Sequence, residues 1–327
     1  MTAAPRTRVQ RRPVHGVLLL DKPLGLSSND ALQKVKWLLR AEKAGHTGTL
    51  DPLATGVLPL CFGAATKFSQ LHLDADKTYE AVARLGTTTS TGDAEGAVLQ
   101  QREVHVTAED LAAVTARFTG RIQQVPPMHS ALKKDGKALY EYARAGIEVE
   151  REAREVHIHA LNMAFAEDLP PHIAIKMIVK CSKGTYIRTL GEDVGAALGC
   201  GAHLRALRRT GTGGFGLAQC VTLAQLEAMD EDQRLACLLP VEALLPDHTP
   251  VTLDSDNAAR FLNGVRRRGS WADMPQVAVF GDAPVALLGT AHTEAGELVP
   301  GRLLSPQEIQ QILEKSPRRE RDTLEAL

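Results

Sequence analysis

The chain has 327 residues, of which 44% are hydrophobic and 24% charged, and its formal net charge is −1. This length and composition predict a globular protein with a packed core, built as one large domain plus a small one or as two medium domains. The near-zero charge excludes a globally basic chain, so basic character has to be sought in local clusters. No apolar run is long enough to predict a membrane span.

The cysteines and short motifs argue against a metal site and against a disulfide framework. The five cysteines are odd in number and widely spaced, and none forms a C-x-x-C pair. The histidines have no H-E-x-x-H spacing, and the chain has no G-x-S-x-G elbow and no G-K-[ST] phosphate cradle after its glycine-rich loop. The sequence therefore predicts a cytoplasmic protein that needs neither a metal nor a cofactor.

The predicted elements begin after a basic N-terminal segment. Residues 1–15 are rich in arginine and lack the apolar core of a secretory signal, so they predict a flexible basic arm. Apolar runs and period-two alternation predict strands at 16–23, 78–86 and 172–181. Capping residues and helical spacing predict helices at 26–41, 107–120 and 184–199.

The order of these elements predicts the fold class and the domains. Strands and helices mix without a regular βαβ rhythm, which favours an α+β fold with a large mixed sheet over a doubly wound fold. Residues 16–250 are predicted as the main domain, because the composition changes at their end. Residues 251–316 predict a small, mostly β domain closed by a helix starting at Ser305 and Pro306, and 317–327 a frayed tail.

The segment GHTGTLDPLATG holds a single acid, Asp51, among small, hydroxyl and apolar residues. On spacing alone the favoured interpretation is a helix start, with Asp51 as the cap and Pro52 at the first helical position. The alternative is that Gly45, Gly48 and Gly56 allow a close backbone approach and that the loop presents Asp51 to a ligand.

Two of the four tyrosines, Tyr79 and Tyr186, each follow a lysine by two or three residues. A base could stack on such a ring with its phosphates near the lysine, although an amphipathic core tyrosine is the simpler interpretation. Arg188 falls in the first turn of a predicted helix, where the helix dipole disfavours a cation. Either a carboxylate partner offsets this or the arginine is solvated.

Basic residues gather in four short clusters. Such runs are usually solvated faces, but in a chain without net charge they could also form one phosphate-binding face. The clusters are Arg6–Arg12, Lys133–Lys137, Arg205–Arg209 and Arg266–Arg268.

Six longer segments follow one another over most of residues 16–210. They are GVLLLDKPLGLSSNDALQKVK, AGHTGTLDPLATGVLPLCFGAATKFSQ, DKTYEAVARLG, TGDAEG, SALKKDGKALYEYARAGIEVEREAR and CSKGTYIRTLGEDVGAALGCGAHLRALRR. Together, and in this order, they resemble the bacterial tRNA pseudouridine synthases of the TruB type.

The resemblance implies a fold and an activity. The fold would be a large, mainly antiparallel sheet flanked by helices, with a PUA-like RNA-binding domain at 251–316 and an RNA-gripping insertion at about 125–152. The activity would be isomerisation of the uridine at position 55 in the T loop of tRNA, by base flipping and an essential aspartate. The expected partner is the T stem-loop of tRNA, and we expect a monomer. A non-catalytic tRNA-binding protein or RNA chaperone of the same fold is the alternative.

The resemblance also assigns roles to individual residues. Asp51 would be the catalytic acid, kept ionised by Arg188, and Tyr79 would stack on the flipped base. His46 would fill the space that the base vacates. The other implied positions are Tyr186 and Leu207, which would wall the pocket, and Asp93, an acid near the ion pair. Two positions depart from the family pattern, His129 in place of a tyrosine and Ser90 in place of an acid.

Overall fold

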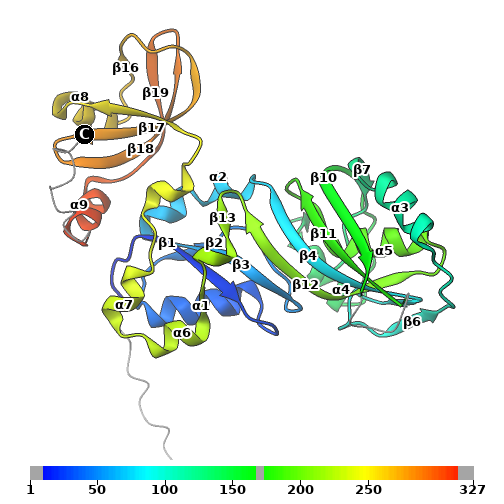
Figure 1. The fold of residues 1–327 in the computed structure, drawn as a ribbon. Coiled ribbons are helices and arrows are strands. Elements are labelled where there is room, and N and C mark those ends of the chain that lie inside the picture. Colours follow the sequence, from blue (N-terminus) through cyan, green and yellow to red (C-terminus); the bar gives the residue numbers. More distant parts are fainter. Residues whose placement is uncertain (1–9, 167–172, 316–327) are drawn as a thin grey trace, which may run out of the picture.

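The computed structural model describes residues 10–166 and 173–315 and has the predicted α+β class (Figure 1). A ten-stranded sheet forms the main body, and a smaller five-stranded sheet follows it. The main sheet is mainly antiparallel, because only the β14–β1 and β3–β12 pairs are parallel.

Eight strands form the continuous path of the main sheet, and two short strands join its centre. The path runs in the order β14 (Val221–Thr222), β1 (Gly16–Lys22), β3 (Ala54–Phe62), β12 (Ala202–Thr212), β4 (Lys77–Leu85), β11 (Ala174–Cys181), β10 (Arg154–Phe165) and β7 (Gly120–Gln124). The joining strands are β2 (Ala44–His46), which pairs with β3, and β13 (Phe215–Gly216), which pairs with β12.

One face of this sheet carries the helices and the main hydrophobic core. The core includes residues of α1 (Ser28–Leu38), α3 (Ala108–Arg117) and α5 (Ile187–Ala197), packed on inward-facing residues of β1, β3, β4, β11 and β12. The opposite face of β11 is exposed at Lys176, Ile178 and Lys180, as period-two alternation requires. Side chains in the core face of β4 and β12 therefore lie between the sheet and α5.

The remaining elements are short and lie at the edges or in connections. The helical ones are η1 (Gly63–Lys67), α2 (Ser69–Leu73), α4 (Leu139–Arg144), η2 (Leu217–Gln219), α6 (Leu223–Ala228), α7 (Glu231–Ala236) and η3 (Val241–Leu244). The strand pairs are β5 (Thr87–Thr89) with β6 (Val98–Gln101) and β8 (Lys133–Lys134) with β9 (Lys137–Ala138). The last pair and α4 lie inside the segment 125–152.

The predicted helix starts are confirmed where side chains cap them. Ser27 accepts a hydrogen bond from the Asp30 main-chain N–H at the start of α1, and Thr107 and Asp110 form a complete capping box at α3. The helix predicted to begin at Asp51 is wrong, because a turn follows that residue and β3 begins at Ala54. Strand β3 is buried at eight of its nine positions, so it lacks the alternation that would have identified it.

The predicted mostly β C-terminal domain is confirmed. Its sheet has the order β15 (Thr249–Leu253), β17 (Met274–Asp282), β18 (Val285–Glu294), β19 (Glu297–Leu303) and β16 (Arg267–Arg268). Two helices pack beside it, α8 (Ser255–Leu262) and α9 (Pro306–Lys315). A second hydrophobic cluster runs from Val17 and Val57 of the main sheet through Leu244 into this domain. The two sheets therefore share one continuous apolar contact network.

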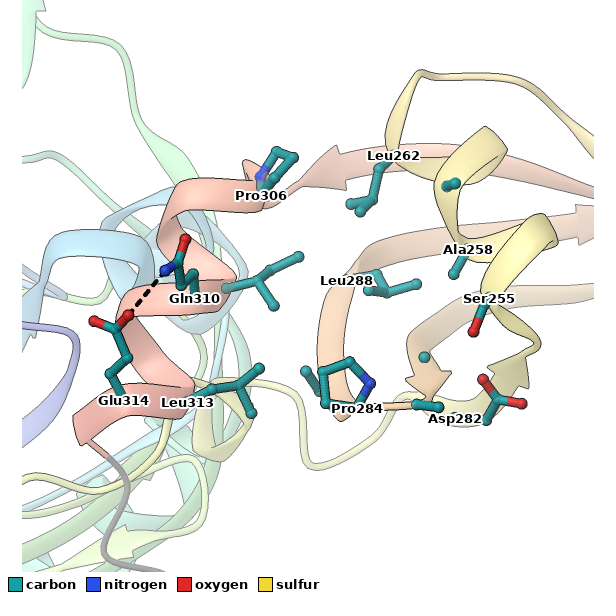
Figure 2. Close-up of a pocket in the computed structure, with 15 residues that line it drawn as sticks. Ser255, Ala258, Leu262, Asp282, Pro284, Leu288, Pro306, Gln310, Leu313 and Glu314 are labelled. Carbon is teal, nitrogen blue, oxygen red and sulfur yellow. Dashed lines mark hydrogen bonds between the residues drawn. The ribbon is translucent and has the colours of Figure 1, made fainter.

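A cavity of about 610 Å³ lies within the C-terminal domain (Figure 2). Its apolar lining comes from Ala258 and Leu262 of α8, Leu288 of β18 and Ile309 and Leu313 of α9. None of the residues implicated by the sequence in chemistry lines it, so the cavity belongs to the packing of α9 rather than to the candidate site.

The predicted basic arm is in part folded onto the body. The Arg11 guanidinium donates to the main-chain oxygens of Lys36 and Ala41, and Arg12 forms an ion pair with Glu231. The prediction of a flexible arm over residues 1–15 is therefore wrong at Arg11 and Arg12. Residues 1–9 and the tail predicted at 317–327 lie outside the described residues.

Close packing of α5 on β12 generates a stability prediction at Gly195. A methyl group on Gly195 would overlap the main-chain nitrogen and Cβ of Ala202. In an open helix, Gly→Ala stabilises by up to about 1 kcal/mol, but overpacking costs about 1–3 kcal/mol. We expect Gly195→Ala to lower the free energy of unfolding by about 2 kcal/mol in urea denaturation, whereas Gly214→Ala, which has open space, changes it little. A stabilised Gly195→Ala protein would contradict this packing.

Candidate active site

Asp51 lies in the connection between β2 and β3, at the centre of the main sheet. The Ser28 hydroxyl anchors this connection to α1, because it accepts from the Leu50 N–H at 2.7 Å and donates to the Leu50 oxygen at 3.0 Å. Gly48 has φ +81°, a conformation that favours glycine. The turn therefore holds Asp51 next to the start of β3, and Asp51 keeps 38% of its side chain exposed.

Arg188, in the first turn of α5, is the partner of Asp51. Its Nε lies 2.8 Å from Asp51 Oδ2 and 3.7 Å from Asp93 Oδ2, and its side chain is only 5% exposed. Its terminal nitrogens donate to the oxygens of Thr91 at 3.0 Å and His129 at 2.6 Å. The predicted carboxylate partner is therefore present, and the solvated interpretation of Arg188 is wrong.

The pKa of Asp51 is set by opposing effects. Burial raises the pKa above the ordinary value of 3.8, Arg188 lowers it, and the neighbouring charge of Asp93 raises it again. The net direction is upward. Arg188 thus favours the ionised form, as expected, but burial outweighs it, and Asp51 is a more basic carboxylate than an exposed aspartate.

Asp93 is held at the ion pair by its own loop. Its side chain accepts from the Thr91 hydroxyl at 2.5 Å and from the Glu95 N–H at 3.1 Å, which leaves the other carboxylate oxygen toward Arg188. Ser90, where the family pattern has an acid, accepts from the Ala97 N–H and so closes the same turn. His129 lies in the insertion 125–152, and its main-chain oxygen accepts a hydrogen bond from Arg188.

Tyr79 and Tyr186 flank this ion pair on different elements. Tyr79 points from β4 into the core face and is 8% exposed, while Tyr186 is the N-cap residue of α5 and is half-buried. Burial raises the pKa of both hydroxyls, and the charge of Asp51 adds to the rise. Lys77 is buried and donates to the oxygens of Leu73 and Ala75, so the alternative of a phosphate contact at the lysine before Tyr79 is wrong.

His46 and Leu207 complete the set from the two sides of β3. His46 ends β2, and among the described residues its buried Nδ1 has no hydrogen-bond partner. Burial, followed by the charge of Arg209, lowers the pKa of His46, so the ring is neutral near pH 7. Leu207 of β12 pairs with Ala54, three residues after Asp51, and is 8% exposed.

The basic cluster Arg205–Arg209 does not form a solvated run. Alternation along β12 leaves Arg208 paired with Asp21 at 2.7 Å and turns Arg209 inward, where it is 1% exposed. The sequence interpretation missed Arg209, although its place two residues after Leu207 puts both on one face. In the C-terminal domain, Arg266 and Arg268 both pair with Glu297.

Two features are absent from the part of the chain that the structure describes. No group of three or more His, Cys, Asp or Glu side chains is arranged to hold a metal ion within residues 10–166 and 173–315. Over the same ranges, no helix has the length and apolar character that crossing a membrane requires.

The opposing effects on Asp51 generate a titration prediction. Losing the Arg188 charge should raise the Asp51 pKa, and losing the Asp93 charge should lower it. We expect Arg188→Gln and Asp93→Asn to move the pKa of the Asp51 carboxyl in opposite directions. The titration is followed by ¹³C NMR, and the Asp51 signal is assigned by its loss in Asp51→Asn. In the unaltered protein the carboxyl should titrate above 3.8. Shifts in the same direction would contradict the ion-pair account.

Family models match two adjoining parts of the chain. One described as "TruB family pseudouridylate synthase (N terminal domain)" matches residues 36–187. One described as "tRNA pseudouridylate synthase B C-terminal domain" matches residues 188–246. Because β12 lies in the second part and pairs with β3 and β4 of the first, both parts build the same sheet and the same site.

Similar proteins cover nearly the whole chain. The tRNA pseudouridine synthase B of Verminephrobacter eiseniae is 68% identical over 323 residues, 98% of each chain. That of Cupriavidus pinatubonensis is 59% identical over 306 residues, 91% of this chain and 96% of the relative.

A solved structure described as "Crystal Structure of a Cbf5-Nop10-Gar1 Complex" has a TM-score of 0.63 and 27% identity over 92% of this chain and 82% of that one. An H/ACA RNP bound to a substrate RNA containing 2'-deoxyuridine has the same fold, with a TM-score of 0.64 at 24% identity over 90% of this chain and 86% of that one. The chain belongs to the TruB family of pseudouridylate synthases, which are isomerases.

Proposed function

We propose that this protein converts uridine to pseudouridine at position 55 in the T loop of tRNA, with Asp51 as the essential carboxylate. The observation that carries the proposal is the ion pair between the buried Arg188 and the partly exposed Asp51, which lies among residues that could hold an extruded base. The names of the relatives support uridine isomerisation in tRNA. The T-loop position rests on the family resemblance alone.

The chemistry is redox-neutral and isomeric. The N1–C1′ bond breaks, the base turns, and a C5–C1′ bond forms on the same ribose, while the proton on C5 is lost and N1 regains one. Such a reaction needs a nucleophile or a base close to C1′ and C6, and an ionised carboxylate serves in either role. Asp51 is suited to both roles, since burial raises its pKa and Arg188 keeps an ionised form accessible.

The target base must leave its stack before it can reach Asp51. Extrusion costs a few kcal/mol, and stacking of the base on Tyr79 would return about 1–3 kcal/mol. Tyr186 and Leu207 would form the walls of the pocket. His46, whose buried Nδ1 has no partner among the described residues, would enter the space left in the RNA and find its partner there.

Three further segments would bind the rest of the RNA. The insertion 125–152 would grip the stem-loop, and its His129 oxygen on Arg188 connects that grip to the ion pair. The C-terminal domain at 251–316 would act as a PUA-like RNA-binding domain. We propose a monomer acting on one T stem-loop, recognised mainly by its shape, as is usual for RNA.

The role of Asp51 predicts a separation of binding from conversion. We expect Asp51→Asn to bind tRNA with nearly unchanged affinity and to release no tritium from tRNA labelled at C5 of uridine, because the amide can neither attack nor accept a proton. The control is Asp232→Asn, the same chemical change at an exposed position of α7, which should leave release unchanged. Normal release by Asp51→Asn would exclude an essential carboxylate and favour the non-catalytic alternative.

The stacking role distinguishes Tyr79 from a surface tyrosine. Tyr140 is 37% exposed and lies under the Arg144 guanidinium. We expect Tyr79→Leu to slow single-turnover conversion by about tenfold or more, because stacking of about 1–3 kcal/mol is lost, and Tyr140→Leu to slow it far less. Rates are compared at saturating enzyme, with thermal unfolding to check the fold. Equal losses in the two variants would make Tyr79 a core residue only.

A further inference from the structure

Arg209 is a buried cation at the centre of the main sheet. Its side chain is 1% exposed, Nε donates to the Val57 oxygen at 2.7 Å, and a terminal nitrogen donates to the Gly48 oxygen at 3.1 Å. Both hydrogen bonds, within the described chain, go to main-chain oxygens rather than to a carboxylate. A charge buried in this way is costly to remove from water, so Arg209 is a weak source of stability.

Arg209 and Tyr79 are direct cross-strand neighbours. They face each other in the antiparallel register of β12 and β4, so the two side chains are neighbours on one face of the sheet. Burial raises the pKa of the Tyr79 hydroxyl, and the Arg209 guanidinium opposes the rise. The Arg209 side chain therefore lies beside the ring on which the base would stack.

The same guanidinium also reaches the loop that carries Asp51. Gly48 lies three residues before Asp51, and a Cβ there would come within 3.2 Å of an Arg209 nitrogen. Gly56, on the neighbouring strand β3, pairs with Arg209, and a Cβ at Gly56 would overlap the Arg209 oxygen. Glycine at both positions allows the arginine to connect β4, β12 and the Asp51 loop.

We propose that Arg209 is a positioning residue, whose guanidinium holds the Tyr79 hydroxyl and the Gly48 oxygen so that the stacking ring and the Asp51 loop keep a fixed separation. This inference rests on the proposed function. Arg209 acts through Tyr79 and the loop, and Arg208, on the opposite face of β12, has no part in it.

A double-mutant cycle tests the connection through Tyr79. Single-turnover conversion of a tRNA transcript is measured for the unaltered protein, Arg209→Lys, Tyr79→Phe and the double variant, with Arg208→Lys as the control. We expect each single variant to lose about tenfold and the double variant to lose little more than one single, because both changes break the same contact. Arg208→Lys should retain the rate of the unaltered protein.

The contrary outcomes are distinct. A double variant that loses the product of the two factors would mean that Arg209 and Tyr79 act independently, and an unaltered rate in Tyr79→Phe would mean that the hydroxyl is not used. Either result overturns the inference while conversion by the unaltered protein still supports the proposed function. No conversion by the unaltered protein would instead reject the function.

A second measurement does not depend on activity or on tRNA. The chain has four tyrosines, so protein labelled with 3-fluorotyrosine gives few ¹⁹F NMR signals, and Tyr79→Phe identifies the one from Tyr79. We expect Arg209→Lys to shift or broaden the Tyr79 signal and Arg208→Lys to leave it in place. An unmoved Tyr79 signal in folded Arg209→Lys protein overturns the inference. If Arg209→Lys does not fold, the conversion rate of Tyr79→Phe alone decides whether the hydroxyl matters.

Discussion

The ion pair between Arg188 and Asp51 is the interaction on which the rest of the site depends. Two carboxylates, Asp51 and Asp93, share one guanidinium at 2.8 and 3.7 Å, and the other nitrogens of that guanidinium bind main-chain oxygens of two loops. A buried cation with this set of partners fixes the Asp93 turn, the insertion and the Asp51 loop relative to one another. The start of α5 is an unfavourable place for a cation, and the acids supply the compensation.

The position of that ion pair follows from the centre of the main sheet. The parallel pair β3–β12 places Leu207 beside the start of β3, and the antiparallel pair β12–β4 places Arg209 opposite Tyr79. Residues from three distant parts of the sequence therefore meet over a few strand positions. Because the helices pack on that same face, the site is enclosed on the side of α5, and Asp51 remains the more exposed partner of the ion pair.

Local sequence patterns predicted the capped helices and the alternating strands better than the continuously buried strand β3. Capping residues identified α1 and α3, and alternation identified β11. The segment after Asp51 could not be predicted, since β3 is a continuous buried apolar run interrupted by a proline, which periodicity cannot distinguish from a helix. Arg209 was hidden because a buried arginine in a basic cluster looks like a surface residue until the strand and its facing are known. Spacing alone favoured a helix cap at Asp51, and the long ordered resemblance to a family was what favoured a catalytic role.

The proposal that this site acts on one uridine of the T loop is tested most directly by mapping pseudouridine in tRNA. A tRNA transcript incubated with the protein can be derivatised at pseudouridine and mapped nucleotide by nucleotide by mass spectrometry. The account predicts a single derivatised residue, at position 55, with the unaltered protein and none with Asp51→Asn. Derivatisation at another position, or equal derivatisation with Asp51→Asn, would contradict it.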